Sequence, residues 1–177
     1  KHASLNLKKT ESIMTLQITL CATPFAYGVP FFYFETLEEY KEEYQKQFDK
    51  YHCEEYEFQF IDGDDITWIL WKACNGDIFK LLEIIEEEII TTEREAIQLY
   101  VCTNINGDTL EDALNRYQDI HLYQGSMKDY AYKIFQWDLV PEFLHSYIDI
   151  DQYVTDLLCN GDLYKLDGDL DGWCVVR

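Results

Sequence analysis

The chain contains 177 residues, which is enough for one medium domain or for two to three small ones. Hydrophobic residues make up 47% of the chain and aromatic residues 16%, so the composition excludes a disordered acidic tail and indicates a protein with a buried core. The formal net charge is −20, from 34 acidic and 14 basic side chains. A folded chain this acidic repels nucleic acid and anionic membranes, and it attracts basic surfaces over long distances.

Six cysteines are spread along the chain at separations of fifteen residues or more, with no C-x-x-C pair. This spacing excludes a typical zinc cluster. Each cysteine lies beside apolar or aromatic residues, as buried free thiols usually do. We therefore predict a reduced, intracellular protein, with a disulfide pair as the alternative. The cysteines are Cys21, Cys53, Cys74, Cys102, Cys159 and Cys174.

The polar residues 1–14 predict a flexible N-terminal segment, and Met14 is a candidate native start. An uncharged run from Ser12 to Phe34 raises the question of a membrane span. Pro24 and Pro30 interrupt that run, as do several threonines, which a spanning helix of about 20 apolar residues would not normally carry. We predict two strands joined by a loop, and neither a membrane span nor a signal peptide.

Residues 15–62 predict a small N-terminal α+β subdomain. Alternation of apolar and polar residues predicts strands at residues 16–22, 31–35 and 54–62. Between the second and third strands, apolar residues recur at spacings of three and four, which is typical of an amphipathic helix. We expect Thr36 to cap this helix and Glu39 to complete a capping box.

Residues 63–103 predict a helical middle subdomain, with helices at residues 65–74, 77–89 and 91–102. Asp77 is the expected N-cap of the second helix, and Thr91 or Thr92 that of the third. One apolar stripe is expected along the second helix. Its members are Ile78, Leu81, Leu82, Ile85 and Ile89.

Residues 104–177 predict a C-terminal α+β subdomain that begins after the linker N-I-N-G-D. The expected elements are a helix at 109–117, a short strand at 118–123, a helix capped by Ser126, a helix opening with Pro141, a helix from about Ile150 to Cys159 closed by Gly161, and a hairpin pairing 163–166 with 173–176. The predicted class is therefore α+β, with short antiparallel sheets, packed helices and a helical middle part.

The stretch K-L-D-G-D-L-D-G-W, at residues 165–173, contains the alternating aspartates that open a calcium-binding loop. The bidentate Glu of that loop would fall at position 178, beyond Arg177, and the flanking segments predict strands where the motif needs helices. Gly168 and Gly172 suit a hairpin turn instead. A second acidic cluster, at residues 62–65, fits a turn followed by a helix cap. A calcium-dependent module is kept as a minor alternative.

No pattern indicates catalysis. The chain has no G-x-S-x-G, no P-loop and no G-x-G-x-x-G, and carboxylate pairs arise by chance among so many acids. The adjacent His52 and Cys53 do not make a dyad, because neighbouring side chains on a regular element point apart. The other histidines, His2, His121 and His145, show no metal-binding spacing. We predict no enzyme, no cofactor and no metal.

The acidic residues themselves are the remaining signal. Duplex DNA carries one negative charge per about 1.7 Å of its axis. A helix with two outward acids per turn of about 5.4 Å presents one charge per about 2.7 Å. Several such helices approach the charge density of DNA, so a basic DNA-binding groove would accept the protein in place of its substrate. A surface that is merely acidic, or adapted to high salt, is the plainer interpretation.

Three segments in residues 104–177 resemble the C-terminal part of the ArdA antirestriction family. They are E-D-A-L-N-R-Y-Q-D-I-H-L-Y-Q-G-S-M-K-D-Y-A-Y, L-V-P-E-F-L-H-S-Y-I-D-I-D-Q-Y-V-T-D-L-L and G-D-L-Y-K-L-D-G-D-L-D-G-W-C-V-V-R. The most specific match is the V-P-x-x-L-x-x-Y-I-D motif that begins at Val140. Residues 15–62 are similar in element order, and the middle segment is similar only as acidic helices.

The resemblance implies an elongated protein of three small α and β parts that looks like bent DNA and is commonly dimeric. It implies occupation of the DNA-binding groove of a type I restriction-modification enzyme, or of a related defence complex, in the cytoplasm of a bacterial host that a phage or other mobile element enters. It implies no cofactor, no catalysis, no direct nucleic-acid binding and no membrane. An acidic adaptor that binds another basic protein is the alternative function.

Thirteen outward acids are the predicted partner-binding residues, and this group is called the acidic set below. Asp108 and Asp149 have an alternative role as helix caps, and the others have one in keeping the surface solvated. The acidic set is Glu38, Glu42, Glu43, Glu83, Glu86, Glu87, Asp108, Glu111, Asp112, Asp129, Asp149, Asp151 and Asp156.

Overall fold

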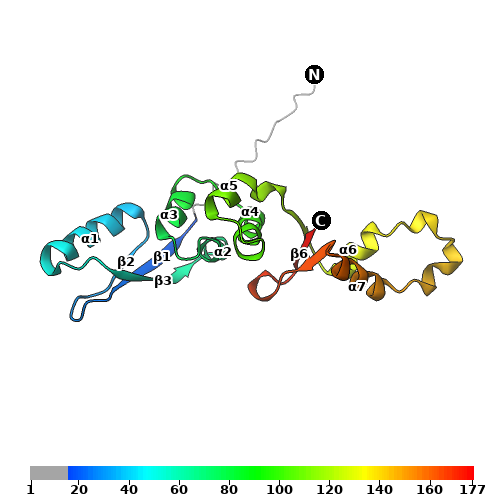
Figure 1. Ribbon diagram of the computed structural model, residues 1–177, viewed down its shortest axis with the longest axis horizontal. Helices are drawn as coiled ribbons and strands as arrows, with labels where there is room; N and C mark the ends of the chain where they lie inside the picture. The colour runs from blue at the N-terminus through cyan, green and yellow to red at the C-terminus, as the bar shows by residue number, and fades with distance from the viewer. Residues whose placement is uncertain (1–15) are drawn as a thin grey trace, which may run out of the picture. The chain divides into compact units, whose positions relative to one another are not determined.

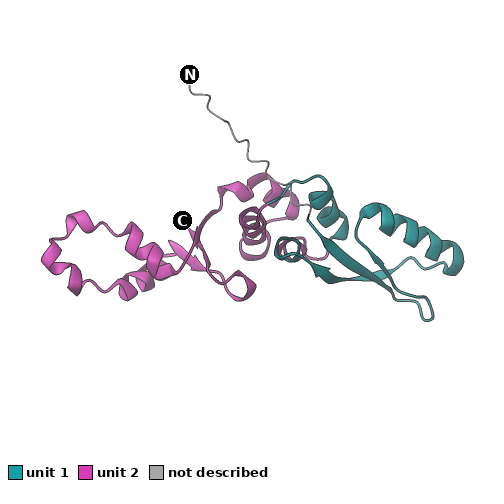
Figure 2. Ribbon diagram, turned by 180° about the vertical axis from the view of Figure 1, so that it is seen from behind, with its two compact units in different colours: residues 1–68, 77–91 teal, residues 69–76, 92–177 magenta. Residues whose placement is uncertain are grey.

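The computed structural model describes residues 16–177, and contacts within the chain divide it into two compact units (Figures 1 and 2). The first unit contains residues 16–68 and 77–91, and the second contains residues 69–76 and 92–177. Helices and two small antiparallel sheets make up the fold, which confirms the predicted α+β class. The predicted middle subdomain, residues 63–103, contributes to both units. The predicted flexible segment, residues 1–14, lies outside the described residues.

A three-stranded antiparallel sheet with the order β2-β1-β3 forms the base of the first unit. Its strands are β1 (Ile18–Pro24), β2 (Phe32–Phe34) and β3 (Tyr56–Gly63). Helix α1 (Leu37–Tyr51) lies along one face of this sheet (Figure 1). The ring of Tyr40 on α1 lies 5.1 Å from the ring of Phe34 and 5.7 Å from that of Phe58, between centroids. Aromatic packing thus joins α1 to the two outer strands, β2 and β3.

Helix α1 begins after Thr36, as predicted, because the Thr36 hydroxyl accepts a hydrogen bond from the Glu39 N–H at 3.2 Å. The expected capping box is wrong in one hydrogen bond, the one between the Glu39 carboxylate and the N–H of Thr36. The Glu39 carboxylate accepts from the N–H of Glu35 at 2.7 Å, one residue before the cap. The extended backbone leading into the helix brings this earlier N–H within reach of Glu39.

Helix α3 (Ile78–Glu86) begins at the predicted cap, Asp77, but ends before the predicted boundary. Glu88 has a left-handed backbone, with φ +52°, and this residue breaks the helical period. Ile84, within the helix, is fully buried, whereas Ile89, beyond its end, is 38% exposed. The predicted stripe is correct for its first three members and wrong for Ile85, which is half-buried, and for Ile89.

The turn between β3 and α2 (Asp65–Ala73) is held by Asp64. Its carboxylate accepts hydrogen bonds from the N–H of Thr67 at 2.9 Å and from the N–H of Gln17 at 3.1 Å. The Thr67 hydroxyl donates to the backbone carbonyl of Gln17 at 2.9 Å. The prediction of a turn and helix cap in residues 62–65 is confirmed.

The second unit contains α4 (Glu93–Tyr100), which opens with a capping box between Thr92 and Glu95. The helix does not end as an α-helix. It continues as a π-helix, η1 (Val101–Ile105), in which the Thr103 hydroxyl donates to the Leu99 carbonyl at 3.2 Å. Helix α5 (Leu110–Arg116) and a short 3₁₀ turn, η2 (Tyr117–Asp119), follow. No sequence pattern predicted the π-helix.

The sheet of the second unit has the strand order β4-β6-β5. Its strands are β4 (His121–Gln124), β5 (Leu163–Lys165) and β6 (Trp173–Val176). Helices α6 (Met127–Ile134) and α7 (Ile150–Asn160) close a core with it. The fully packed members of this core are Ala131, Ile150, Leu157, Leu163 and Cys174.

Most of these helices begin or end at the residues that the sequence predicts. Ser126 caps α6, and Gly161 ends α7 with φ +78°, as predicted. The helix expected after Pro141 is a 3₁₀ helix, η4 (Glu142–Tyr147), preceded by another, η3 (Trp137–Leu139). None of the residues in these two turns is buried, so little tertiary packing supports a regular α-helix there.

All six cysteines are free, and five of them are buried. Cys159 is the exception to the predicted burial, because it lies on the exposed side of α7. Within residues 16–177, no helix combines the length and the apolar character that crossing a bilayer requires.

Replacing Gly63 with alanine should destabilise the first unit by about 1–3 kcal/mol, the usual cost of overpacking. A Cβ at this position would lie 2.5 Å from the Thr67 Oγ1 and 2.8 Å from the Gln17 carbonyl oxygen. Urea unfolding followed by circular dichroism measures the loss. Gly161→Ala is the control, since its Cβ would meet nothing within 4 Å and only its φ of +78° is strained. A loss at Gly63 no larger than that at Gly161 would contradict the steric account.

Candidate acidic surface

Both units carry a large excess of negative charge. The described part of the first unit has 17 acidic and 4 basic side chains, a formal net charge of −13. The second unit has 16 acidic and 7 basic side chains, a net charge of −9. The acidity is therefore a property of the folded body and not of one tail or one loop.

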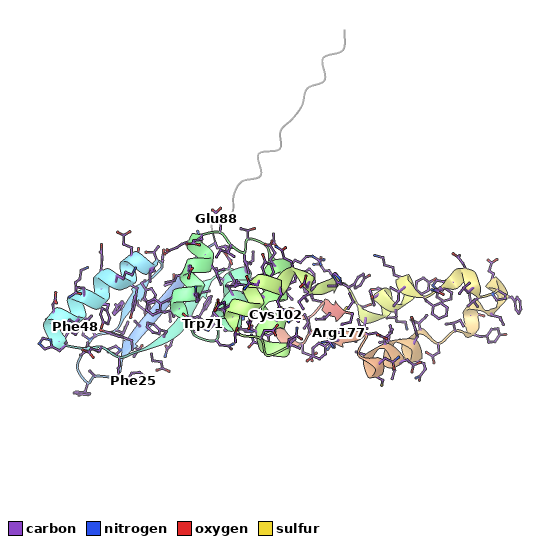
Figure 3. All side chains as sticks on the ribbon, turned by 45° about the horizontal axis from the view of Figure 1, so that its top comes forward. Phe25, Phe48, Trp71, Glu88, Cys102 and Arg177 are labelled. Atoms are coloured by element: carbon purple, nitrogen blue, oxygen red, sulfur yellow. The ribbon has the colours of Figure 1, made fainter. Side chains whose placement is uncertain are left out.

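Most of the acidic set is exposed on the surface of these units. Glu43 and Glu83 are half-buried beside lysines, and Asp108 is largely shielded. Figure 3 shows side chains projecting from the helices of both units. The exposed members are Glu38, Glu42, Glu86, Glu87, Glu111, Asp112, Asp129, Asp149, Asp151 and Asp156.

Two helices position the acids of the first unit. Glu38 and Glu42 lie one turn apart on α1, and no hydrogen bond within residues 16–177 engages either carboxylate. Glu86, at the end of α3, accepts a hydrogen bond from the N–H of Leu37 at 2.8 Å. This contact ties the start of α1 to α3. Glu86 thus has a structural role that its sequence position does not reveal.

In the second unit, acids of the first helical turns are held by the caps. Asp149 caps α7 by accepting from the N–H of Gln152 at 3.0 Å. Asp112 accepts from the Thr109 hydroxyl at 2.7 Å, and Asp129 from the Ser126 hydroxyl at 2.6 Å. These bonds fix carboxylates at the positive ends of helix dipoles, where a negative charge stabilises the helix.

Some of the acids pair with surface lysines. Asp151 lies 2.8 Å from the Lys128 ammonium, and the hydrogen bond and charge of Asp151 raise the pKa of Lys128 above its ordinary value. Glu43 raises the pKa of Lys46 in the same way. Both lysines are exposed, and such pairs are weak and screened by salt. A basic partner can therefore displace them at little cost.

Asp108 does not lie outward, contrary to the prediction. Its side chain is 20% exposed and lies 3.8 Å from the Arg116 guanidinium. Its Oδ2 atom is buried and has no hydrogen-bond partner among the described residues. Burial raises the pKa of the Cys102 thiol, and the charge of Asp108 adds to that rise. Thr109, and not Asp108, caps α5, so the alternative role as a cap is also wrong.

Four glutamates line one depression of about 380 Å³ between α1 and the sheet. Glu42 and Glu43 belong to the acidic set, whereas Glu35 and Glu39 do not. The signal for Glu39 was present in the sequence, because Glu39 and Glu43 are four residues apart and lie on one helical face. Glu35 precedes the helix, so only the fold shows that it joins this cluster.

The aspartates of the calcium-like stretch do not converge. Asp167 and Asp171 lie 2.5 and 3.9 Å from the Lys165 ammonium, and Asp169 lies 2.5 Å from that of Lys72. Gly168 and Gly172 have φ values of +70° and +94°, which confirms the predicted hairpin turn. Across residues 16–177, no group of three or more His, Cys, Asp or Glu side chains is arranged to hold a metal ion.

The described histidines and thiols form no nucleophile pair. His52 is the left-handed C-cap of α1, with φ +55°, and the thiol of the adjacent Cys53 donates to the Glu55 carbonyl. His145 binds the backbone carbonyl of Val140 through Nε2 at 2.9 Å. Each of these groups has a local structural partner.

Comparison with known proteins adds nothing to this description, since no family model, curated protein or solved structure matches the chain. The chemistry of the surface is therefore the basis for assigning a function. Its chief features are carboxylates that are exposed, ordered by helix caps and weakly paired with lysines.

Two substitutions separate the contribution of the Asp149 helix cap to stability from that of its charge. Asp149→Ala removes the acceptor for the Gln152 N–H, and we expect a loss of about 1 kcal/mol in the free energy of unfolding. Asp149→Asn keeps a good N-cap without the charge, and it should change stability by only a few tenths of a kcal/mol. Chemical denaturation of the two variants side by side measures both effects. Equal losses would show that the charge, and not the cap, stabilises α7.

Proposed function

We propose that this protein is an antirestriction protein that mimics DNA. In this proposal it occupies the DNA-binding groove of a type I restriction-modification enzyme, or of a related DNA-binding defence complex, and blocks it. The observation that carries the proposal is the set of exposed carboxylates on capped helices in both units. The resemblance of residues 104–177 to the ArdA family supports the same target class.

Charge spacing on α1 supports the proposal. Glu38, Glu39, Glu42 and Glu43 place two acids on each of two consecutive turns. This is about one charge per 2.7 Å of helix, compared with about 1.7 Å for duplex DNA. Three lysines on the same helix reduce its net charge, so one helix alone is a weaker mimic than DNA. The proposal therefore requires acids from several elements to act together.

Order in the acidic surface favours tight binding. A flexible acidic tail would lose conformational entropy when a basic groove fixes it. Here the backbone is already folded, and hydrogen bonds at the helix starts fix acids such as Asp149 and Asp129. Counterions released from the basic groove would supply much of the driving force, as they do for DNA. The proposed mechanism needs no cofactor and no chemical step.

An acidic adaptor that binds a basic protein outside its DNA-binding groove is the second candidate. Exposed apolar side chains are the observation that favours it, because attraction between charges does not account for them. Leu139, Phe143 and Tyr147 are 76%, 75% and 81% exposed in the segment between α6 and α7. Such residues are common at protein interfaces. They would equally serve the homodimer that the ArdA resemblance implies.

Competition with DNA separates the two functions. A purified type I restriction-modification enzyme is bound to a fluorescent duplex containing its recognition site, and the protein is titrated in while anisotropy is recorded. We expect displacement of the duplex, with an apparent affinity that falls steeply as salt increases, since both ligands act through counterion release. Binding to the enzyme without displacement of DNA would contradict the mimic and support the adaptor.

Charge reversal at several positions should abolish the displacement. Single reversals should each cost no more than about 1 kcal/mol of binding, because exposed charges are screened. Six simultaneous substitutions to lysine should remove it, with the fold retained by circular dichroism, because none of the six side chains caps the N-terminus of a helix. The six are Glu38, Glu42, Glu87, Glu111, Asp151 and Asp156.

The matched control exchanges the same six residues between Glu and Asp, which preserves every charge. This variant should displace DNA as well as the original protein does. If the control loses displacement to the same extent as the reversal, side-chain shape and not charge determines binding, and the mimic proposal fails.

A further inference from the structure

A groove of aromatic side chains lies in the first unit, apart from the acidic set. It has a volume of about 630 Å³, within the usual range for ligand sites. Aromatic rings form most of its wall, and Lys41, Glu54 and Glu55 lie at its border. We call it the aromatic groove. Its aromatic members are Phe25, Tyr40, Tyr44, Tyr56, Phe58 and Phe79.

The rings of the groove present faces in several directions. The rings of Tyr40 and Phe79 are 5.7 Å apart and nearly perpendicular, at 79°. Those of Tyr40 and Phe58 are also 5.7 Å apart, at 65°, and those of Tyr44 and Tyr56 are 5.9 Å apart, at 59°. Edge-to-face packing leaves the electron-rich face of one ring in each pair free of its partner. Such faces attract cations.

The acids are held beside these rings by the backbone. The N–H of Phe25 donates to the carbonyl of Glu55 at 3.2 Å, which fixes the β1–β2 connection, labelled at Phe25 in Figure 3, against the start of β3. The side chains of Glu54 and Glu55 are exposed, while Phe79 is 49% exposed. A neutral apolar ligand would desolvate these two carboxylates without compensation. A cation would pair with them.

The hydroxyl of Tyr56 also lacks a partner. It is buried, and it makes no hydrogen bond with the described residues, since the nearby Cys53 thiol donates to the Glu55 carbonyl. Burial, followed by the effect of Cys53, raises the pKa of Tyr56 far above its ordinary value, so the hydroxyl stays neutral. The Tyr56 side chain therefore contributes ring surface to the groove and no charge.

We propose that the aromatic groove binds an arginine side chain presented by the basic partner protein. A guanidinium is planar, stacks on aromatic faces and is more weakly hydrated than an ammonium, so it fits rings bordered by carboxylates better than lysine does. This inference rests on the proposed function for the source of the arginine. It adds a specific contact to the distributed attraction of the acidic set.

The test is a titration of isotope-labelled protein with the peptide acetyl-Gly-Arg-Gly-amide, followed by NMR. Shift changes should concentrate on the six aromatic residues of the groove and persist at 0.15 M salt. The same peptide with citrulline, a neutral isostere of arginine, should bind at least about twofold more weakly. Changes spread over all exposed acids, or equal binding of citrulline, would overturn the proposal.

Substitutions show whether each side chain strengthens or weakens binding of the arginine peptide. Glu54→Gln with Glu55→Gln should weaken binding of the arginine peptide about two- to fivefold, whereas Lys41→Gln should strengthen it by removing a like charge. Phe79→Leu keeps apolar area but removes a ring face, and it should weaken binding about two- to fivefold. If Lys41→Gln weakens binding, the peptide is not held in the groove by its positive charge, and the proposal fails.

Matched controls lie on the same unit outside the groove. Glu57→Gln with Glu87→Gln removes two exposed carboxylates, and Phe31→Leu removes an exposed ring. None of these changes should alter peptide affinity, and an effect as large as that of the groove variants would overturn the proposal. Since the assay contains no DNA and no enzyme, failure of the arginine site leaves the DNA-competition result standing. Failure of DNA competition likewise leaves the peptide result standing.

Discussion

Mutual repulsion among carboxylates is the constraint that this fold has to overcome. Charge of this density opposes compaction, because each acid brought near another raises the free energy of the folded state. Buried apolar side chains provide the opposing term, in the aromatic layer around Tyr40, in helices α2 to α4 and in the cluster around Leu157 and Cys174. Burial of apolar surface stabilises the fold by about 25 cal/mol per Å², and this offsets the repulsion among the acids.

The acids also contribute to the order of the chain. Asp64 joins the ends of β1 and α2, Glu86 holds the start of α1, and Asp149 closes the first turn of α7. Each of these carboxylates accepts a backbone N–H that would otherwise lack a partner. The same residue type therefore serves as a fixed surface charge and as a structural acceptor. Whether a particular acid is available to a partner depends on which of these roles it has.

Local signals in the sequence were sufficient for most helix starts. Thr36, Asp77, Ser126 and Gly161 act at the predicted ends because capping depends on a few neighbouring residues. Tertiary features were not predictable in this way. The shielded position of Asp108, and the gathering of α1, β3 and α3 residues around the aromatic groove, depend on how separate elements pack. Such packing produces no repeating pattern in the sequence.

The π-helix after α4 has an evolutionary consequence. Each residue of an α-helix turns the chain by about 100°, and a π-turn accommodates one additional residue. Loss of a single codon between Val101 and Ile105 would therefore leave an ordinary α-turn, with the flanking residues close to their present directions. Asp108 and Arg116 both follow this segment, so a deletion there would leave them side by side. The wider turn lets the chain change its length by one residue at this point without replacing or redirecting an acid.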